Sequence, residues 1–180
     1  MDDRALVEAV IRGDQHAFEQ IVERETAAVF HACYRILGRL HDAEDATQES
    51  FVTAYRALGT FRGDGTLAAW LARIAVRQAL RTATRRRESV PIDGEAGVAL
   101  ASGIGDPLGD ALDAERGRLV RAAVAGLPEP YREIIALRFF AELSLVEIAQ
   151  ATDRPIGTVK SYLHRGLERL RDRLGVEVAA

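Results

Sequence analysis

Four residues in the middle of the chain have the types and the spacing that binding of single-stranded DNA requires. Arg73, Arg77 and Arg81 recur at intervals of four, so in a helix they form one basic stripe, and Trp70 lies beside it. Arginines can hold backbone phosphates while an aromatic ring offers its face to an unpaired base. A loop with three glycines, 59–66, precedes the stripe and leaves room for such a base. A solvated basic helix is the alternative that the stripe alone leaves open.

A second polar group lies near the carboxyl end of the chain. Apolar residues at helical spacing define one buried face there, namely Val159, Leu163, Leu167, Leu170 and Leu174. Ser161 and Arg165 lie opposite that face. The polar residues that flank them are Thr158, Lys160 and His164. Preceded by a short helix and a tight turn, this pattern predicts a helix-turn-helix that enters the major groove. An ordinary helical hairpin with a basic face is the alternative.

A third group is acidic and lies on a helix expected from Ala43 to about Leu58. Its polar members share one exposed side, namely Glu44, Asp45, Gln48 and Glu49, and its apolar side is expected to hold Phe51, Val52, Tyr55 and Leu58. Acids early in a helix also complement its dipole. A metal site is disfavoured, because His41 is expected to lie before the helix and no other histidine completes a ligand set. An exposed acidic face suits a basic partner.

Neither catalysis nor a cofactor is indicated. The four histidines are dispersed (His16, His31, His41 and His164), no serine or cysteine occupies a nucleophile motif, and no glycine loop for phosphate is present. Cys33 is the only cysteine, which excludes an intrachain disulfide and a cysteine-rich zinc site. We therefore expect no catalytic residue, no metal and no cofactor, and we expect Cys33 to be an inert core residue.

Periodicity and end signals predict an all-α chain. The expected helices are two within 4–37, broken near Gly13 and Asp14 and ended by Gly38, then 43–58, 67–86 with Thr66 as its cap, 110–125, 131–140, one starting at Leu145, and one starting at Ile156 or Gly157. Ser144 and Glu147 form a capping box before the seventh of these. Pro155 ends that helix, because it disfavours helical geometry in the residue before it.

Charge and composition divide the chain further. The net charge of −3 conceals blocks of −5 (1–60), +6 (61–87), −6 (88–117) and +2 (118–180). The third block is rich in glycine and has no aromatic residue, so it cannot bury enough surface to fold alone. We expect two small helical domains, 1–87 and 110–180, joined by a flexible acidic linker, 88–109. No apolar run is long enough to span a membrane, and no signal peptide is evident, so we expect a cytoplasmic protein without membrane insertion.

Several motifs resemble those of extracytoplasmic-function sigma factors, the bacterial subunits that direct RNA polymerase to promoters. They are AED-x-x-QE-x-F at 43–51, Trp70-Leu71 with Arg73-Ile74-Ala75, LPEPYRE at 127–133, and GTVKS with LHR at 157–165. The resemblance implies that Asp45, Gln48 and Glu49 face the core polymerase and that Phe51 packs inward. It also implies minus-ten contacts by Phe61, Arg62, Trp70, Arg73, Arg77 and Arg81, and minus-thirty-five contacts by Thr158, Lys160, Ser161, His164 and Arg165. An anti-sigma factor is the further partner implied.

The sequence departs from the family's usual pattern at five positions. Arg77 stands where asparagine is usual, Arg81 where aspartate is, Asp153 where the turn has glycine, Tyr162 where arginine is common, and Gly166 where alanine is. These departures bear on base preference. The alternative function is a stand-alone helix-turn-helix regulator with an N-terminal partner-binding domain. It would bind duplex operator as a dimer, and it leaves the acidic helix and the Trp70 helix unexplained.

Overall fold

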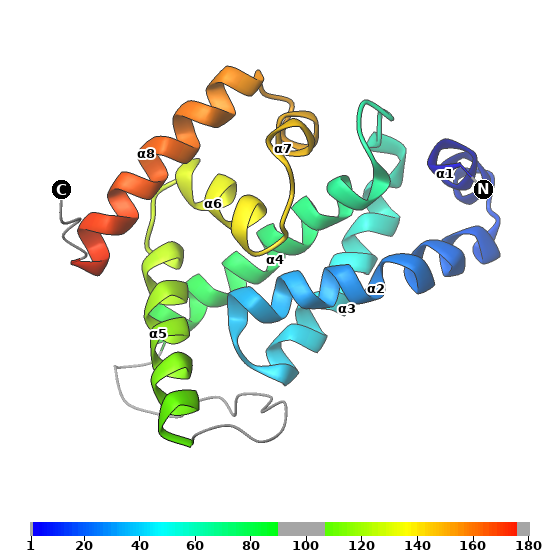
Figure 1. Cartoon of the computed structure of the whole chain (residues 1–180). Coiled ribbons are helices and arrows are strands. Elements are labelled where there is room, and N and C mark those ends of the chain that lie inside the picture. The colour runs from blue at the N-terminus through cyan, green and yellow to red at the C-terminus, as the bar shows by residue number, and fades with distance from the viewer. Residues whose placement is uncertain (1, 90–106, 176–180) are drawn as a thin grey trace.

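A computed structural model describes residues 2–89 and 107–175 of the chain. In these ranges it contains eight α-helices, one short 3₁₀ helix and no strand, which confirms the predicted all-α class (Figure 1). The helices are α1 (Asp3–Ile11), α2 (Gln15–Leu37), α3 (Leu40–Ala57), η1 (Leu58–Thr60), α4 (Leu67–Ser89), α5 (Pro107–Ala125), α6 (Tyr131–Phe139), α7 (Leu145–Thr152) and α8 (Ile156–Leu174). Across the described ranges, none of these helices is both long and apolar enough to cross a membrane.

Helices α1 to α4 form the N-terminal unit, in which α2, α3 and α4 pack against one another (Figure 1). The expected break before α2 is confirmed, and Asp14 caps that helix by accepting a hydrogen bond from the Ala17 amide at 3.3 Å. Gly38 ends α2 in the left-handed conformation, with φ of 69°, which a residue without Cβ adopts easily. The fully buried Ile21, Leu58 and Leu71 belong to the core between these helices.

The start of α4 is fixed from two sides. Thr66 accepts a hydrogen bond from the Ala69 amide at 3.1 Å, so the predicted cap is confirmed. Asp3 of α1 accepts a second one from the Leu67 amide at 2.8 Å and pairs with Arg24 of α2 at 2.7 Å. Although burial by itself raises the pKa of Asp3, these contacts hold it below its ordinary value. The first turn of α4 is therefore held in place by the N-terminal helix.

Helices α5 to α8 form the C-terminal unit, in which α7 and α8 are the predicted helix-turn-helix. The Ser144 and Glu147 capping box at the start of α7 is confirmed, with both reciprocal hydrogen bonds present. Helix α8 starts at Ile156, as expected. A Cβ on Gly166 would lie 3.0 Å from Ile135 Cγ1, so the absence of a side chain lets α8 approach α6 closely. Gly166 costs α8 about 1 kcal/mol of helix propensity relative to alanine. The close packing of α8 on α6, which the missing side chain allows, offsets this cost.

The two units pack against each other in the described structure. Helices α6 and α7 lie against α4 (Figure 1), and one cluster of buried apolar side chains includes Leu71 and Ala75 of α4 together with Ile134 and Ile148 of the C-terminal unit. Helix α4 continues to Ser89 and α5 begins at Pro107, so both extend past the expected ends at Arg86 and Asp110. Most of the predicted linker, 88–109, lies outside the described residues. The proposed domain boundaries stay a prediction.

Two local expectations were wrong. His41 lies inside the first turn of α3 and not before it, because the helix already begins at Leu40. Val52 is 44% exposed, because its position on α3 shares the side of the acidic residues. Tyr55 is 52% exposed, although its ring packs edge to face on Phe18 with centroids 4.9 Å apart. On α4 the buried positions include Ala75, Val76, Ala79 and Leu80, whereas Ile74 and Gln78 are only partly buried.

Cys33 should be chemically inert in the folded protein. Its side chain is fully buried, and burial raises the pKa of the thiol to about 11. Because only the thiolate is a nucleophile, about 0.1% of the thiol is reactive at pH 8 even before access is considered. We expect iodoacetamide to modify Cys33 only after denaturation, as measured by intact mass. Rapid labelling of the native protein would contradict the buried position.

Candidate nucleic-acid interface

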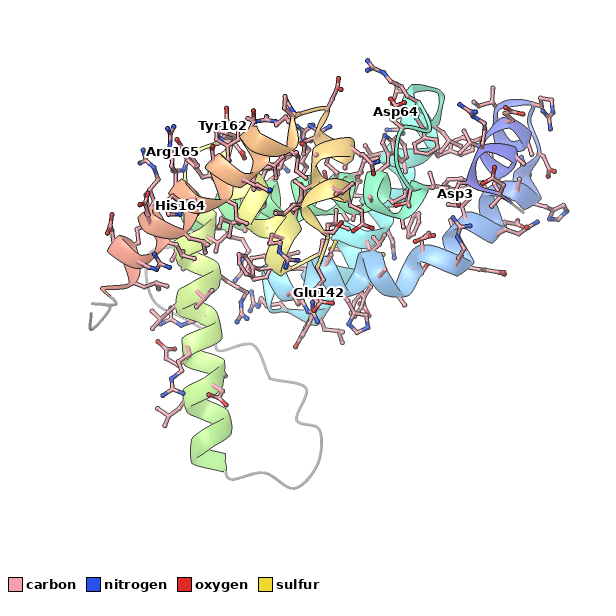
Figure 2. The ribbon with its side chains drawn as sticks, turned by 45° about the horizontal axis from the view of Figure 1, so that its top comes forward. Asp3, Asp64, Glu142, Tyr162, His164 and Arg165 are labelled. Carbon is pink, nitrogen blue, oxygen red and sulfur yellow. The ribbon has the colours of Figure 1, made fainter. Side chains whose placement is uncertain are left out.

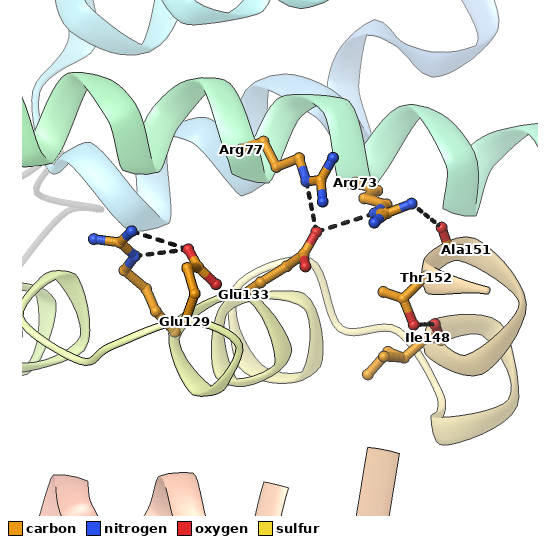
Figure 3. A network of polar contacts seen from close by, with 8 residues as sticks. Arg73, Arg77, Glu129, Glu133, Ile148, Ala151 and Thr152 are labelled. Atoms are coloured by element: carbon orange, nitrogen blue, oxygen red, sulfur yellow. Dashed lines mark hydrogen bonds and ion pairs between the residues drawn. The ribbon is translucent and has the colours of Figure 1, made fainter. Parts of the chain in front are cut away.

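The basic stripe of α4 lies at the junction of the two units and not on a free surface. Arg73 Nε and Arg77 Nε both donate to Oε1 of Glu133 on α6, at 3.0 and 2.7 Å (Figure 3). Arg73 Nη1 also donates to the Ala151 carbonyl at the end of α7, at 2.7 Å. The side chain of Arg73 is 23% exposed and that of Arg77 is 49% exposed. The expected spacing is present, but two of the three arginines are already occupied.

Glu133, the acid of α6 that contacts the stripe, was not among the residues predicted from the sequence. Its side chain is only 5% exposed, which would favour the neutral acid, because burial penalises charge. Burial alone raises its pKa, but the hydrogen bonds from Arg73 and Arg77 outweigh that effect and hold the pKa below its ordinary value. Glu133 is therefore a carboxylate at neutral pH. Its contribution to the contact is lost only when the pH falls through that lowered pKa. The one available signal was an acid directly before the buried run 134–137.

Arg81, the third arginine of the stripe, lines an open cleft. The cleft has a volume of about 450 Å³ and lies between α4 and the start of α6. Its charged lining comprises Arg77, Arg81, Arg85, Arg132, Arg154, Glu129 and Glu133. Arginines outnumber acids in this lining, so the cleft is a cationic surface suited to phosphate. Arg81 itself is exposed.

The loop before α4 forms a small cavity with the end of α7. The cavity has a volume of about 240 Å³, and its walls include Phe61, Trp70, Gln150 and Asp153. Phe61 and Trp70 pack edge to face with ring centroids 5.8 Å apart, and both are partly buried. Arg62 pairs with Asp153 Oδ2 at 3.3 Å. The predicted base-binding residues are thus together, but residues of α7 and its C-cap supply part of the cavity wall.

The residues predicted to read duplex DNA lie on the outer side of α8. Lys160, Ser161, His164 and Arg165 are exposed, whereas Thr158 is partly buried. Figure 2 shows His164 and Arg165 projecting from α8, away from α4. His164 Nε2 lies 3.3 Å from Glu168 Oε1 one turn later. This surface is therefore free in the described structure, in contrast to the stripe on α4.

Besides Arg77, two further departures from the family pattern have structural partners, namely Tyr162 and Asp153. Tyr162 packs edge to face on Tyr131, with ring centroids 5.8 Å apart, and the guanidinium of Arg154 lies 5.4 Å from its ring centre. Asp153 adopts the left-handed conformation, with φ of 54°, where a glycine would be unstrained. It also supplies the carboxylate that pairs with Arg62.

The predicted polymerase-binding residues are exposed. Asp45, Gln48 and Glu49 lie on the outer face of α3, whereas Phe51 is buried, as the resemblance implied. Val52 and Tyr55 lie on the same outer face, so apolar side chains stand among the acids. Interfaces combine such an apolar centre with charged surroundings. The residue types of Val52 and Tyr55 were visible in the sequence, but their exposure was not.

Comparisons with known proteins agree with these features. Residues 21–89 match the sigma-70 region 2 family and residues 117–170 the sigma-70 region 4 family. The chain is 34% identical over 176 residues to the ECF RNA polymerase sigma factor SigW of Bacillus subtilis, covering 93% of this chain and 94% of that protein. It is 38% identical over 183 residues to the ECF RNA polymerase sigma-E factor of Escherichia coli K12, covering 97% and 95%.

Two solved structures have a similar fold. One is CnrH in complex with the cytosolic domain of CnrY, with a TM-score of 0.62, 24% identity, and coverage of 98% of this chain and 99% of that one. The other is the sigma factor RpoE of Bartonella quintana with the anti-sigma factor NepR, with a TM-score of 0.56, 23% identity, and coverage of 89% and 98%. The motifs, the helical fold and relatives that match almost end to end establish that this chain belongs to the extracytoplasmic-function sigma factors of the sigma-70 family.

Proposed function

We propose that this chain binds core RNA polymerase and directs it to promoters, with α3 contacting the core enzyme, the α4 surface contacting the melted minus-ten element and α8 reading the minus-thirty-five element. The α4 surface comprises Phe61, Arg62, Trp70, Arg73, Arg77 and Arg81. The observation that carries this proposal is that both sigma-70 regions match in order along the chain, while α3 and α8 expose their expected binding residues. The chain itself performs no catalysis and acts in the cytoplasm, where the polymerase carries out the chemistry.

The role proposed for each helix follows from the side chains that it presents. The acidic face of α3, with Asp45, Gln48 and Glu49, favours a basic partner, and Val52 and Tyr55 add contact area. On α8, polar and basic side chains project from its N-terminal half, as a helix in the major groove requires. Arg81 in its cationic cleft and the Trp70 ring are suited to phosphate and to an unstacked base.

An anti-sigma factor is the further partner that we propose. The two fold relatives were solved in complex with other proteins, and the partner in one of these complexes is an anti-sigma factor. Binding of such an inhibitor would keep this chain from the core enzyme. A pull-down with the α3 face altered at Asp45 and Glu49 would show whether inhibitor and polymerase use the same surface.

Run-off transcription tests the proposed function against the stand-alone regulator. Purified core polymerase should initiate at discrete sites on genomic fragments only when this protein is added. The stand-alone regulator would instead bind duplex fragments without polymerase and would give no core-dependent start sites. Transcripts that depend on the protein together with core would support the sigma-factor role, and their absence on every fragment that the protein binds would contradict it.

Replacing Arg165 should alter promoter choice. Arg165 is exposed on the outer side of α8, where it can reach a base edge or a phosphate. If it contacts a base, Arg165→Ala should relax the preference at one minus-thirty-five position by about 1–3 kcal/mol. If it contacts phosphate, the affinity should fall about equally on all sequences. Competition binding with single-position promoter variants measures both effects, and unchanged affinity and selectivity would exclude Arg165 from the interface.

A further inference from the structure

The C-terminal unit covers the very arginines that α4 would offer to melted DNA. Glu133 Oε1 accepts hydrogen bonds from both Arg73 and Arg77, and the Ala151 carbonyl takes another from Arg73. Figure 3 shows the Glu133 carboxylate between the two guanidinium groups. Carboxylates and phosphates bind guanidinium groups in the same way, through anionic oxygens that accept charge-assisted hydrogen bonds. The same donors cannot serve Glu133 and a DNA phosphate at once.

The loop that precedes α4 is covered by the same unit. Asp153 pairs with Arg62, and a Cβ built on Gly65 would lie 3.0 Å from the Gln150 Cβ. Gln150, Ala151 and Asp153 form one side of the cavity beside Trp70. An incoming base would therefore meet residues of α7 and its C-cap at the place where the loop has to open.

A further acidic contact joins the units away from the α4 surface. Glu142 pairs with Arg35 of α2 at 2.6 Å, and Arg35 Nη1 also donates to the Phe140 carbonyl at 3.4 Å. Glu142 and Asp153 are the two non-glycine residues with positive φ in the described ranges, at 58° and 54°. Side chains with a Cβ seldom adopt that conformation. In this chain both of the residues that do so pair with an arginine of the N-terminal unit.

We propose that the C-terminal unit is an internal competitor of DNA: Glu133 occupies the place of a DNA phosphate on Arg73 and Arg77, and Asp153 closes the base-binding loop through Arg62. This latch keeps the polymerase-free chain from binding single strands. It leaves the outer side of α8 exposed, so the block is selective for the α4 surface. Arg77 and Asp153, which both depart from the family's usual residues, supply two of its contacts. The inference rests on the proposed DNA-binding role of α4.

The first test measures binding of a fluorescein-labelled single-stranded oligonucleotide to the full chain, without polymerase, by fluorescence anisotropy. A latch that leaves about one molecule in ten open lowers the apparent affinity about tenfold, so Glu133→Gln should raise it by about that factor. Unchanged affinity in a folded Glu133→Gln protein would overturn the latch.

Glu115→Gln is the matched control for that substitution. Glu115 lies on α5, outside the lining of the cationic cleft, and pairs with Arg118 of the same helix at 2.5 Å. Its replacement removes the same charge and should leave single-strand binding as in the unaltered chain. An equal gain in both variants would mean that loss of negative charge alone, and not release of Arg73 and Arg77, raises the affinity, which would also contradict the proposal.

The second test uses a disulfide to hold the end of α7 against the loop before α4, and it leaves Glu133 unaltered. Disulfides require Cβ atoms about 3.5–4.5 Å apart, so the pair Gly65→Cys and Gln150→Cys needs only a small outward shift from 3.0 Å. Cys33 is buried and should not interfere. We expect the oxidised protein to bind no single strands, dithiothreitol to restore binding, and affinity for duplex promoter DNA to stay constant.

Single-strand binding that is equally tight before and after reduction would overturn the latch. A crosslink that fails to form in the folded double variant would also overturn it, because the two residues would not be in contact in solution. Since no polymerase is present, these outcomes are independent of run-off transcription. A failure of the proposed sigma-factor role would appear only in the transcription assay.

Discussion

Holoenzyme carrying Arg81→Ala should open duplex promoters about ten times less efficiently than the unaltered holoenzyme. Arg81 is exposed in the cationic cleft beside α4, where its guanidinium can neutralise a phosphate of the melted strand. A hydrogen bond to a charged group contributes about 1.5–3 kcal/mol, and 1.4 kcal/mol corresponds to a factor of ten. Permanganate reactivity of unpaired thymines in the presence of core polymerase measures the open fraction. A template with a pre-melted bubble should partly rescue the variant.

Arg81 is a cleaner test of melting than Arg77. Arg77 also pairs with Glu133, so Arg77→Ala removes both its proposed DNA contact and its contact with the C-terminal unit. Trp70→Ala has a similar weakness, because Trp70 packs against Phe61. Arg116→Ala, an equally large loss of charge at an exposed position of α5, is the matched control and should open promoters normally. Normal opening by the Arg81 variant would exclude this part of α4 from the melting step.

Reversing the charge at Asp45 and Glu49 should weaken binding to core polymerase roughly a hundredfold, or about 2.7 kcal/mol. Both residues are exposed on α3, and like charges placed across an interface cost several kcal/mol. The fold should be unaffected, because exposed substitutions usually change the free energy of unfolding by no more than about 0.5 kcal/mol. Affinity for immobilised core enzyme, measured at two salt concentrations, separates the electrostatic part from the rest.

The double substitution Asp113→Lys with Glu115→Lys is a suitable control. It introduces the same change in charge on α5, at side chains that are 77% and 51% exposed, and it should bind core normally. Val52→Ser tests the apolar part of the α3 face, and its smaller loss should not depend on salt. Co-purification of the Asp45 and Glu49 variant with core at the level of the unaltered protein would exclude α3 from the contact.

Local sequence was sufficient for most of the helices and their ends. The break near Asp14 and the caps at Gly38, Thr66 and the Ser144–Glu147 box were predicted where the structure has them, because a helix end depends on residues within one turn of it. The acids of α3 and the polar side of α8 were also predicted as exposed. Helical periodicity fixes which side chains share a face, so these predictions needed no knowledge of distant contacts.

Periodicity did not decide which face of a helix meets a partner. On α3, Val52 and Tyr55 were expected inside because they are apolar, yet the packing of α3 against α2 and α4 leaves them outside. On α4, the same packing buried Ala75, Val76, Ala79 and Leu80, while Ile74 and Gln78 stayed partly exposed. Small residues such as Ala75 and Ala79 are weak indicators of a buried face in the sequence. They let neighbouring helices approach closely, so the face of α4 that carries them is the one that is buried in the tertiary structure.

The occupation of the basic stripe was decided only by the tertiary structure. The sequence determined that Arg73, Arg77 and Arg81 share one face beside Trp70, because all of them lie within three turns of one helix. It could not determine that Glu133, fifty-six residues after Arg77, would pair with two of them. Contacts between units depend on how separate apolar faces pack together, and no local rule relates the two segments. The sequence therefore determined a helix with a basic stripe, and the packing of α6 and α7 determined that Arg73 and Arg77 are covered.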